Sequence, residues 1–235
     1  MGISPSLLIA GGYMNYSHIL WDFNGTLLDD VGIGIECINL LLTSRGLPSL
    51  RNREEYQRHF RFPIEEYYRS VGFDFSKDPY DILAHEWVAF YRERENSAPL
   101  FEGAEEILTY VQSRQIPQIL FSATQREMLL QQIEALGIAR YFNEILGSDN
   151  IYAAGKVAVG KAWMAAVMPE RALLIGDSLH DAEAAREMGL ECILIARGHQ
   201  SRETLRAAGV PVLEDLLQVR EFLEGETCEK PEKFR

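Results

Sequence analysis

Hydrophobic positions follow two different spacings in residues 98–224, and the two alternate along the chain. Short continuous apolar runs are typical of buried strands, whereas apolar residues that recur every three or four positions are typical of one face of a helix. The predicted strands are residues 18–23, 117–122, a short stretch within 141–148, 171–177 and 191–196. The predicted helices are residues 103–114, 126–137, 156–167, 178–189, 201–209 and 214–223. This alternation predicts an α/β fold, a Rossmann-like doubly wound parallel sheet with helices on both faces.

The first predicted strand, residues 18–23, leads into an Asn-Gly pair at 24–25. Such a pair is a strong hairpin signal when a second strand follows it. No second strand follows here, because apolar residues between Leu28 and Leu42 recur at helical steps and Gly46 then fits a helix end. The pattern therefore predicts a strand, a tight turn and a helix.

The segment from residue 50 to residue 97 has a different character. It is rich in tyrosine, arginine and glutamate and contains no convincing strand. We expect several amphipathic helices in it, with Pro63 and Pro79 near their starts. Residues 95–103 then return the chain to the alternating pattern, so the helical segment interrupts the α/β region.

Composition limits the possible partners of the chain. Its 235 residues are 47% hydrophobic, which allows one substantial core, or one core with a smaller appendage. Acidic residues outnumber basic ones 35 to 23, giving a net charge of −12, which disfavours nucleic acid and anionic membranes as partners. No apolar run reaches transmembrane length. The three cysteines lie far apart without pair spacing, so we expect free thiols and a cytoplasmic location.

Three of the predicted strands end in residues capable of chemistry, namely Asp22, Ser122 and Asp177, and Asp181 follows four positions later. A helix follows each strand, so the three ends are expected at one edge of the sheet, where ligands of such folds bind. Taken singly, each residue is about as well explained as a turn residue or a helix cap. Together, the carboxylates repel one another unless a cation joins them, and oxygen ligands suit Mg²⁺. Backbone amides after Asp22 and Ser122 would add a site for an anion.

A non-metal cation is also expected at this edge. Lys156 stands at or just before the start of a predicted helix, from which it can point at the sheet edge. Lys161 lies further into the same helix, where a solvated surface lysine is the usual outcome. We therefore favour Lys156 for the site.

These motifs, in this order, resemble the haloacid dehalogenase superfamily, and in particular its phosphoglycolate phosphatase-like hydrolases. The resemblance covers about residues 17–215 and rests on DFNGT, LFSAT, Lys156 and GDSLHD. The helical segment after the first motif resembles the cap domain inserted there in those members. The divisions that follow are a disordered extension (1–13), a core (14–29 and 98–224), an all-helical cap (30–97) and a polar tail (225–235).

The resemblance implies a role for each motif residue. Asp22 would be the nucleophile that attacks phosphorus and forms an aspartyl-phosphate. The implied Mg²⁺ ligands are Asp22, the backbone carbonyl of Asn24, Asp177 and, as a support that also positions Lys156, Asp181. The implied phosphoryl-binding groups are Gly25, Thr26, Ser122, Ala123 and Lys156. The implied reaction is Mg²⁺-dependent hydrolysis of a small phosphorylated metabolite, with phosphoglycolate as the family-level expectation.

Asn24 departs from the family pattern, in which an acidic residue at this position protonates the leaving group. An amide cannot exchange that proton, and general acid–base catalysis is typically worth about 10²–10⁴-fold. One hypothesis is a replacement acid, for which His180 within GDSLHD is the candidate. A second is an enzyme selective for leaving groups that depart without a proton, such as acyl phosphates. A third is a phosphate-binding or regulatory protein without useful turnover.

Substrate choice is expected to come from the helical segment. The candidate contacts are Arg58, His59, Arg61, Tyr67, Tyr68 and Arg69, a partly basic set that would suit a small anionic substrate. For each of these side chains, lying along a helix with a solvated tip is the commoner outcome. His199, after the last strong strand, could approach the site, although a loop histidine is more often exposed.

Overall fold

The computed structural model describes residues 15–150, 152 and 156–225. Within them, the sheet contains six strands: β1 (His18–Trp21), β2 (Gln118–Gln125), β3 (Glu144–Ser148), β4 (Ala172–Gly176), β5 (Glu191–Ile195) and β6 (Val212–Leu213). All neighbouring strands are parallel, in the order β3-β2-β1-β4-β5-β6. The predicted α/β class with a doubly wound parallel sheet is therefore confirmed. The predicted extension, residues 1–13, and all of the predicted tail except Gly225 lie outside the described residues.

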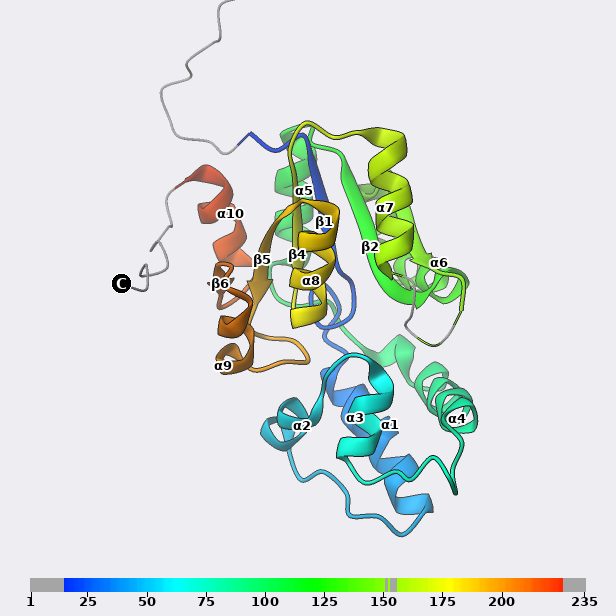
Figure 1. The fold of residues 1–235 in the computed structure, drawn as a ribbon. Coiled ribbons are helices and arrows are strands. Elements are labelled where there is room, and N and C mark those ends of the chain that lie inside the picture. The colour runs from blue at the N-terminus through cyan, green and yellow to red at the C-terminus, as the bar shows by residue number, and fades with distance from the viewer. Residues whose placement is uncertain (1–14, 151, 153–155, 226–235) are drawn as a thin grey trace, which may run out of the picture.

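Helices cover both faces of the sheet, which explains why the central strands are continuously apolar. Ile19 and Trp21 of β1 face one cluster of buried residues, and Leu20 between them faces the other. The first face is covered by α5 (Ala104–Ser113), α6 (Arg126–Ala135) and α10 (Leu217–Glu224). The second face is covered by α7 (Lys156–Val167) and α8 (Leu179–Met188), which lie in front of the strands in Figure 1.

Four helices inserted after β1 form a cap with a hydrophobic core of its own. They are α1 (Val31–Ser44), α2 (Arg53–His59), α3 (Ile64–Ser70) and α4 (Tyr80–Arg92), with the short η1 (Glu95–Ser97) after them. Leu41, Leu42 and Leu83 are fully buried among them. The cap lies beyond the carboxyl ends of the central strands (Figure 1). The inserted all-helical cap is as predicted, with Pro63 and Pro79 at the N-caps of α3 and α4. Its exact limits at residues 30 and 97 stay a prediction.

The sequence prediction missed the true end of β2 and the whole of β6. β2 does not end at Ser122 but runs on to Gln125, with an irregular register against β3 after Phe121. The helix α6 begins at Arg126, as predicted. β6 was not predicted, because a two-residue, half-buried edge strand carries almost no periodic signal.

The C-terminal helices are shorter than their apolar patterns predict. α9 covers only Arg202–Leu205 and is followed by the 3₁₀ turn η3 (Arg206–Ala208). α10 begins at Leu217 rather than at residue 214, because the Asp215 side chain accepts the backbone N–H groups of residues 217 and 218 and so forms a turn before the helix. No helix in the described part of the chain is long and apolar enough to span a bilayer.

We predict that Gly160→Ala lowers the free energy of unfolding by about 1–2 kcal/mol. Alanine alone would favour the helix by about 1 kcal/mol, but Gly160 faces inward on α7. A Cβ at this position would lie 2.9 Å from Cζ of the fully buried Phe121 and against the sulfur of Met188. Overpacking of this kind costs about 1–3 kcal/mol, so the clash outweighs the propensity. Urea unfolding measures the change.

Gly32→Ala in α1 is the matched control, because a Cβ there meets nothing within 4 Å. The same substitution should then leave stability unchanged or raise it by up to about 1 kcal/mol. A neutral or stabilising Gly160→Ala would mean that α7 does not pack this closely against β2 and α8.

Candidate active site

The carboxyl ends of β1 and β4 bring three acidic side chains together. Asp22 follows β1 directly, Asp177 follows β4, and Asp181 lies in the first turn of α8. Each offers a carboxylate oxygen, and these oxygens lie within 4.8 Å of one another. All three side chains are buried. The three carboxylates therefore lie together at one edge of the sheet, where the sequence pattern predicted them.

Lys156 joins two of these carboxylates. It is the first residue of α7 and only 2% exposed, with its Nζ 2.5 Å from Oδ1 of Asp22 and 2.6 Å from Oδ1 of Asp181. Lys161 is exposed and pairs with Glu187 on the surface. Of the two candidate lysines, the structure places Lys156 at the site.

Asp181 is held in place by the helix that carries it. Its Oδ2 accepts hydrogen bonds from the Ser178 hydroxyl at 2.6 Å and from the backbone N–H groups of Ser178 and Asp177 at 3.1 and 3.2 Å. Ser178 in turn caps α8 through a capping box. Both oxygens of Asp181 are therefore already used, one by Lys156 and one by the helix start. This carboxylate is suited to positioning Lys156.

The other two carboxylates are short of positive charge. Burial raises the pKa of Asp22 to about 7, against the opposing effect of Lys156, and Asp181 adds to the rise. Burial likewise raises the pKa of Asp177 to about 8, with His199 opposing and Asp22 and Asp181 contributing. Groups of this kind are relieved by a cation between them.

The donor set at this edge fits Mg²⁺, which prefers carboxylate and carbonyl oxygens. Oδ1 of Asp177 accepts no hydrogen bond within the described residues, and Oδ2 of Asp22 accepts a long 3.3 Å hydrogen bond from Thr26 Oγ1. The backbone is packed tightly around Asp177. A Cβ on Gly25, whose φ is +75°, would lie 2.8 Å from Cγ of Asp177, and a Cβ on Gly198 would overlap the same side chain. Glycine at both positions permits this close approach.

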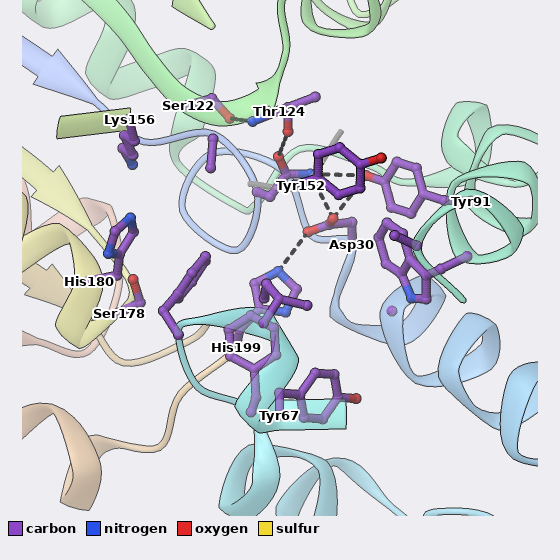
Figure 2. A pocket seen from close by; sticks show the side chains of 18 of the residues that line it. Asp30, Tyr67, Tyr91, Ser122, Thr124, Tyr152, Lys156, Ser178, His180 and His199 are labelled. Carbon is purple, nitrogen blue, oxygen red and sulfur yellow. Dashed lines mark hydrogen bonds and ion pairs between the residues drawn. The ribbon is translucent and has the colours of Figure 1, made fainter. Parts of the chain in front are cut away.

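Asn24 is locked in place by three hydrogen bonds. Its Nδ2 donates to Oδ2 of Asp30 at 2.7 Å and to the Tyr91 hydroxyl at 2.9 Å. Its Oδ1 accepts a 2.7 Å hydrogen bond from the Thr124 hydroxyl. Figure 2 shows this chain of contacts crossing the cavity from Thr124 to Asp30 and Tyr91. The amide is therefore needed as both donor and acceptor, which a carboxylate cannot be.

Asp30 and His199 form a buried ion pair that sequence reasoning missed. His199 Nε2 lies 3.3 Å from Oδ1 of Asp30, and its Nδ1 lies 2.8 Å from the Tyr56 hydroxyl. Burial alone would lower the pKa of His199, but Asp30 raises it to about 9, with smaller contributions from Asp177 and Asp22. The exposed loop histidine that is usual in such a segment is therefore not found here. The backbone N–H of His199 also donates to Oδ2 of Asp177 at 2.5 Å.

The predicted phosphoryl-binding residues Gly25, Thr26, Ser122 and Ala123 have different surroundings, and of these Thr26 donates a hydrogen bond to Asp22. Ser122 is buried, and its Oγ accepts the N–H of Thr124 at 3.1 Å, so it does not cap the following helix, which begins four residues later. The Gly25 N–H donates to Asp30 and to the Leu28 carbonyl, so it is already engaged. Ser122 and Ala123 line the cavity beside Asp22.

His180 lies between Lys156 and Ser178 in Figure 2 and stacks on Phe62 of the cap, with ring centroids 4.3 Å apart. Its Nε2 is buried and has no hydrogen-bond partner within the described residues. Burial lowers the pKa of its imidazole, so the ring is neutral near neutral pH. A neutral imidazole accepts a proton more readily than it gives one.

The cap closes a cavity of about 170 Å³ over these groups. That is roughly ten times the volume needed for one water molecule, so the cavity has room for more than a phosphate. Tyr67 and Tyr68 line it, as expected. The three arginine candidates do not, because Arg58, Arg61 and Arg69 are exposed on the cap surface and contact cap carbonyls or the Phe75 ring. His59 also lies outside the cavity lining and bonds Ser70.

The chain is similar to known hydrolases over most of its length. Residues 19–195 match the family described as haloacid dehalogenase-like hydrolase. A phosphoglycolate phosphatase of Caulobacter vibrioides is 25% identical over 83% of this chain and 86% of that protein. A 5'-nucleotidase of Pseudomonas aeruginosa is 28% identical over 90% and 97%. The crystal structure of a predicted phosphatase from Clostridium acetobutylicum superposes with a TM-score of 0.76, at 19% identity, covering 90% of this chain and all of that one.

We predict that Asn24→Asp destabilises the protein by about 2–4 kcal/mol at neutral pH. The new carboxylate would face Oδ2 of Asp30 at the 2.7 Å distance now spanned by a hydrogen bond, and the donor to Tyr91 would be lost. Leaving buried polar groups unpaired and placing like charges together have costs of this order. Urea unfolding near neutral pH measures the loss.

The double variant Asn24→Asp with Asp30→Asn is the control, because it restores one donor and one carboxylate to the pair. It should recover part of the loss, although the ion pair with His199 is given up. An Asn24→Asp protein as stable as the parent would show that the hydrogen bonds of Asn24 contribute little.

Proposed function

The chain belongs to the haloacid dehalogenase-like hydrolases, and from the groups around Asp22 we propose that it is a Mg²⁺-dependent phosphomonoesterase acting on small phosphorylated metabolites. The observation that carries the proposal is the gathering of Asp22, Asp177 and Asp181 in the lining of one cavity, with Lys156 paired to two of them. Two relatives are named phosphoglycolate phosphatase and 5'-nucleotidase, and both names denote the hydrolysis of a phosphate ester. These names support this reaction class. A hydrolase assignment also disfavours the phosphate-binding, non-catalytic alternative.

In the proposed reaction, Asp22 is the nucleophile. Oδ1 of Asp22 is held by Lys156, while Oδ2 accepts a long hydrogen bond from Thr26. A carboxylate oxygen forms a bond to phosphorus as the bond to the leaving alcohol breaks, and the alcohol oxygen takes up a proton. Water then attacks the aspartyl-phosphate, which releases phosphate and restores the carboxylate.

The surrounding residues position and neutralise the phosphoryl group. Lys156 offsets its charge, and Ser122 with the N–H of Ala123 contacts its oxygens. Asp22, Asp177 and the Asn24 carbonyl would hold Mg²⁺, which neutralises and aligns the phosphoryl oxygens when bound. Thr26 and Gly25 keep the loop after Asp22 in shape, and Asp181 orients Lys156. This work is alignment and charge stabilisation, as in phosphoryl transfer generally.

Proton transfer in this reaction needs another residue, because Asn24 cannot serve as an acid or a base. His180 is the proposed replacement. Its unpaired Nε2 lies among the residues lining the cavity, and its lowered pKa favours accepting a proton from the attacking water over donating one to the leaving group. The leaving alcohol then draws its proton from solvent or from bound water.

We predict that turnover of acetyl phosphate requires Mg²⁺ and is lost by at least about 10³-fold in Asp22→Asn. Mg²⁺ at 100 times its Kd should stabilise the folded parent by about 2.7 kcal/mol, seen as a rise in Tm. Asp177→Asn should abolish that rise, whereas Glu187→Gln, on the surface, should keep it.

Rapid-quench intact mass would detect the aspartyl-phosphate in the parent and not in Asp22→Asn. Mg²⁺-independent turnover, or turnover that survives Asp22→Asn, would exclude this mechanism.

The two lysines provide a second, matched test. Lys156→Met should reduce kcat by about 10²–10³-fold, the usual cost of losing one charge-stabilising donor. Lys161→Met, in the same helix, should keep parental kcat because that side chain is exposed and pairs with Glu187 on the surface. Steady-state kinetics on the folded fraction of each variant measures the difference. Similar losses in both variants would remove Lys156 from the site.

A further inference from the structure

The cap side of the cavity is an aromatic wall. Residues 31–97 contribute twelve of the residues that line the cavity, and eight of these are Tyr, Phe or Trp. Two stacked pairs join this wall to the site: Phe62 lies on His180, and Phe60 lies on His199 at 4.8 Å between centroids. Within the wall, Trp87 stacks on Tyr91 at 5.0 Å, and Tyr91 accepts a hydrogen bond from Asn24. The wall is therefore continuous with the catalytic groups.

Folding leaves part of this wall uncovered. The aromatic lining residues that stay half-buried are Phe60, Phe62, Tyr80, Trp87 and Tyr152. Uncovered aromatic surface inside a cavity is the usual mark of a ligand site, because a ligand can remove it from water. The other two tryptophans, Trp21 and Trp163, are buried in the core. Trp87 is therefore the only tryptophan of the chain with an uncovered surface in the cavity.

The same wall supplies no positive charge. None of its twelve lining residues is Lys, Arg or His. Among the described residues, Lys156 is the only lysine or arginine lining the cavity, and it is paired with Asp22 and Asp181. His199 is paired with Asp30. A carboxylate on the leaving group, such as that of phosphoglycolate, would meet aromatic rings and buried acids with no cation to compensate it.

We propose that the cap wall binds an uncharged, planar aromatic ring carried by the leaving group of the substrate. This inference rests on the phosphatase activity proposed above and names its substrate class, a phosphate monoester of an alcohol that bears such a ring. The phosphoryl group lies at Asp22, and the ring lies across the cavity against Trp87 and Phe62. Flat rings in offset or edge-on contact with aromatic side chains gain more than alkyl groups of the same area.

The test compares uridine 5'-monophosphate with ribose 5-phosphate, which share the same primary phosphate ester and differ in the ring. Uridine 5'-monophosphate should have a kcat/KM about 10–100-fold higher, since stacking of a base on aromatic side chains is worth this much. The gain should appear mainly in KM, because the ring is bound equally in the ground and transition states. Phosphoglycolate should rank with ribose 5-phosphate or below it.

Variants locate the effect. Trp87→Leu and Phe62→Leu should each reduce the ratio of the two kcat/KM values by about 5–10-fold, and the ratio is insensitive to any loss of folded enzyme. Phe75→Leu is the matched control, because Phe75 is a half-buried aromatic residue of the cap that does not line the cavity. It should keep the parental ratio.

A binding measurement separates this inference from the proposed function. Uridine, but not ribose, should quench the fluorescence of Trp87, and the quenching should disappear in Trp87→Leu. Quenching without any turnover of acetyl phosphate would support the ring site and reject the phosphatase. Turnover of acetyl phosphate with equal kcat/KM for the two sugar phosphates, and no quenching, would overturn the ring site and leave the phosphatase standing. A preference for phosphoglycolate would likewise overturn it.

Discussion

The charge balance at Lys156 is the constraint on which the site depends. Three buried carboxylates and one ammonium group, all ionised, leave 3 − 1 = 2 negative charges without a partner. Two uncompensated charges in a buried place are costly, and the raised pKa values of Asp22 and Asp177 express that cost. A single divalent cation cancels them. The excess negative charge of this cluster and the oxygen-only character of its donors both favour the proposed Mg²⁺.

The fold concentrates these charges because two strands end, and two helices begin, at the same edge of the sheet. β1 and β4 are neighbours, so Asp22 and Asp177 leave the sheet side by side. α7 then begins with Lys156, and α8 begins with the capping box that fixes Asp181. Each residue is positioned by the end of a regular element, not by a free loop, which keeps the carboxylates close despite their repulsion.

Much of this could be predicted from sequence, and the physical reason is that it depends on local signals. Continuous apolar strands followed by helices define the sheet and its active edge, so the residue pattern alone is enough to place Asp22, Asp177 and Asp181 together. Contacts between distant segments carry no such signal. The partners of Asp30 come from the cap and from the loop at His199, and only folding shows that the Asp-Asp pair at 29–30 supplies a buried carboxylate. The arginines of the cap lie on its surface, which is the commoner outcome for such side chains. Helix periodicity alone could not decide this, because it does not say which face meets the cavity.

Asn24 and Asp30 are best understood as one unit. Asp30 accepts hydrogen bonds from Asn24 and Tyr91 and pairs with His199, which itself contacts Tyr56. Tyr56 belongs to α2 and Tyr91 to α4, so one carboxylate at the start of α1 ties two cap helices to the loop that follows Asp22. An acid at position 24 would place a second negative charge against that carboxylate. The hydrogen bonds of the amide therefore help to hold the cap over the site, where the cap lines the cavity with aromatic side chains.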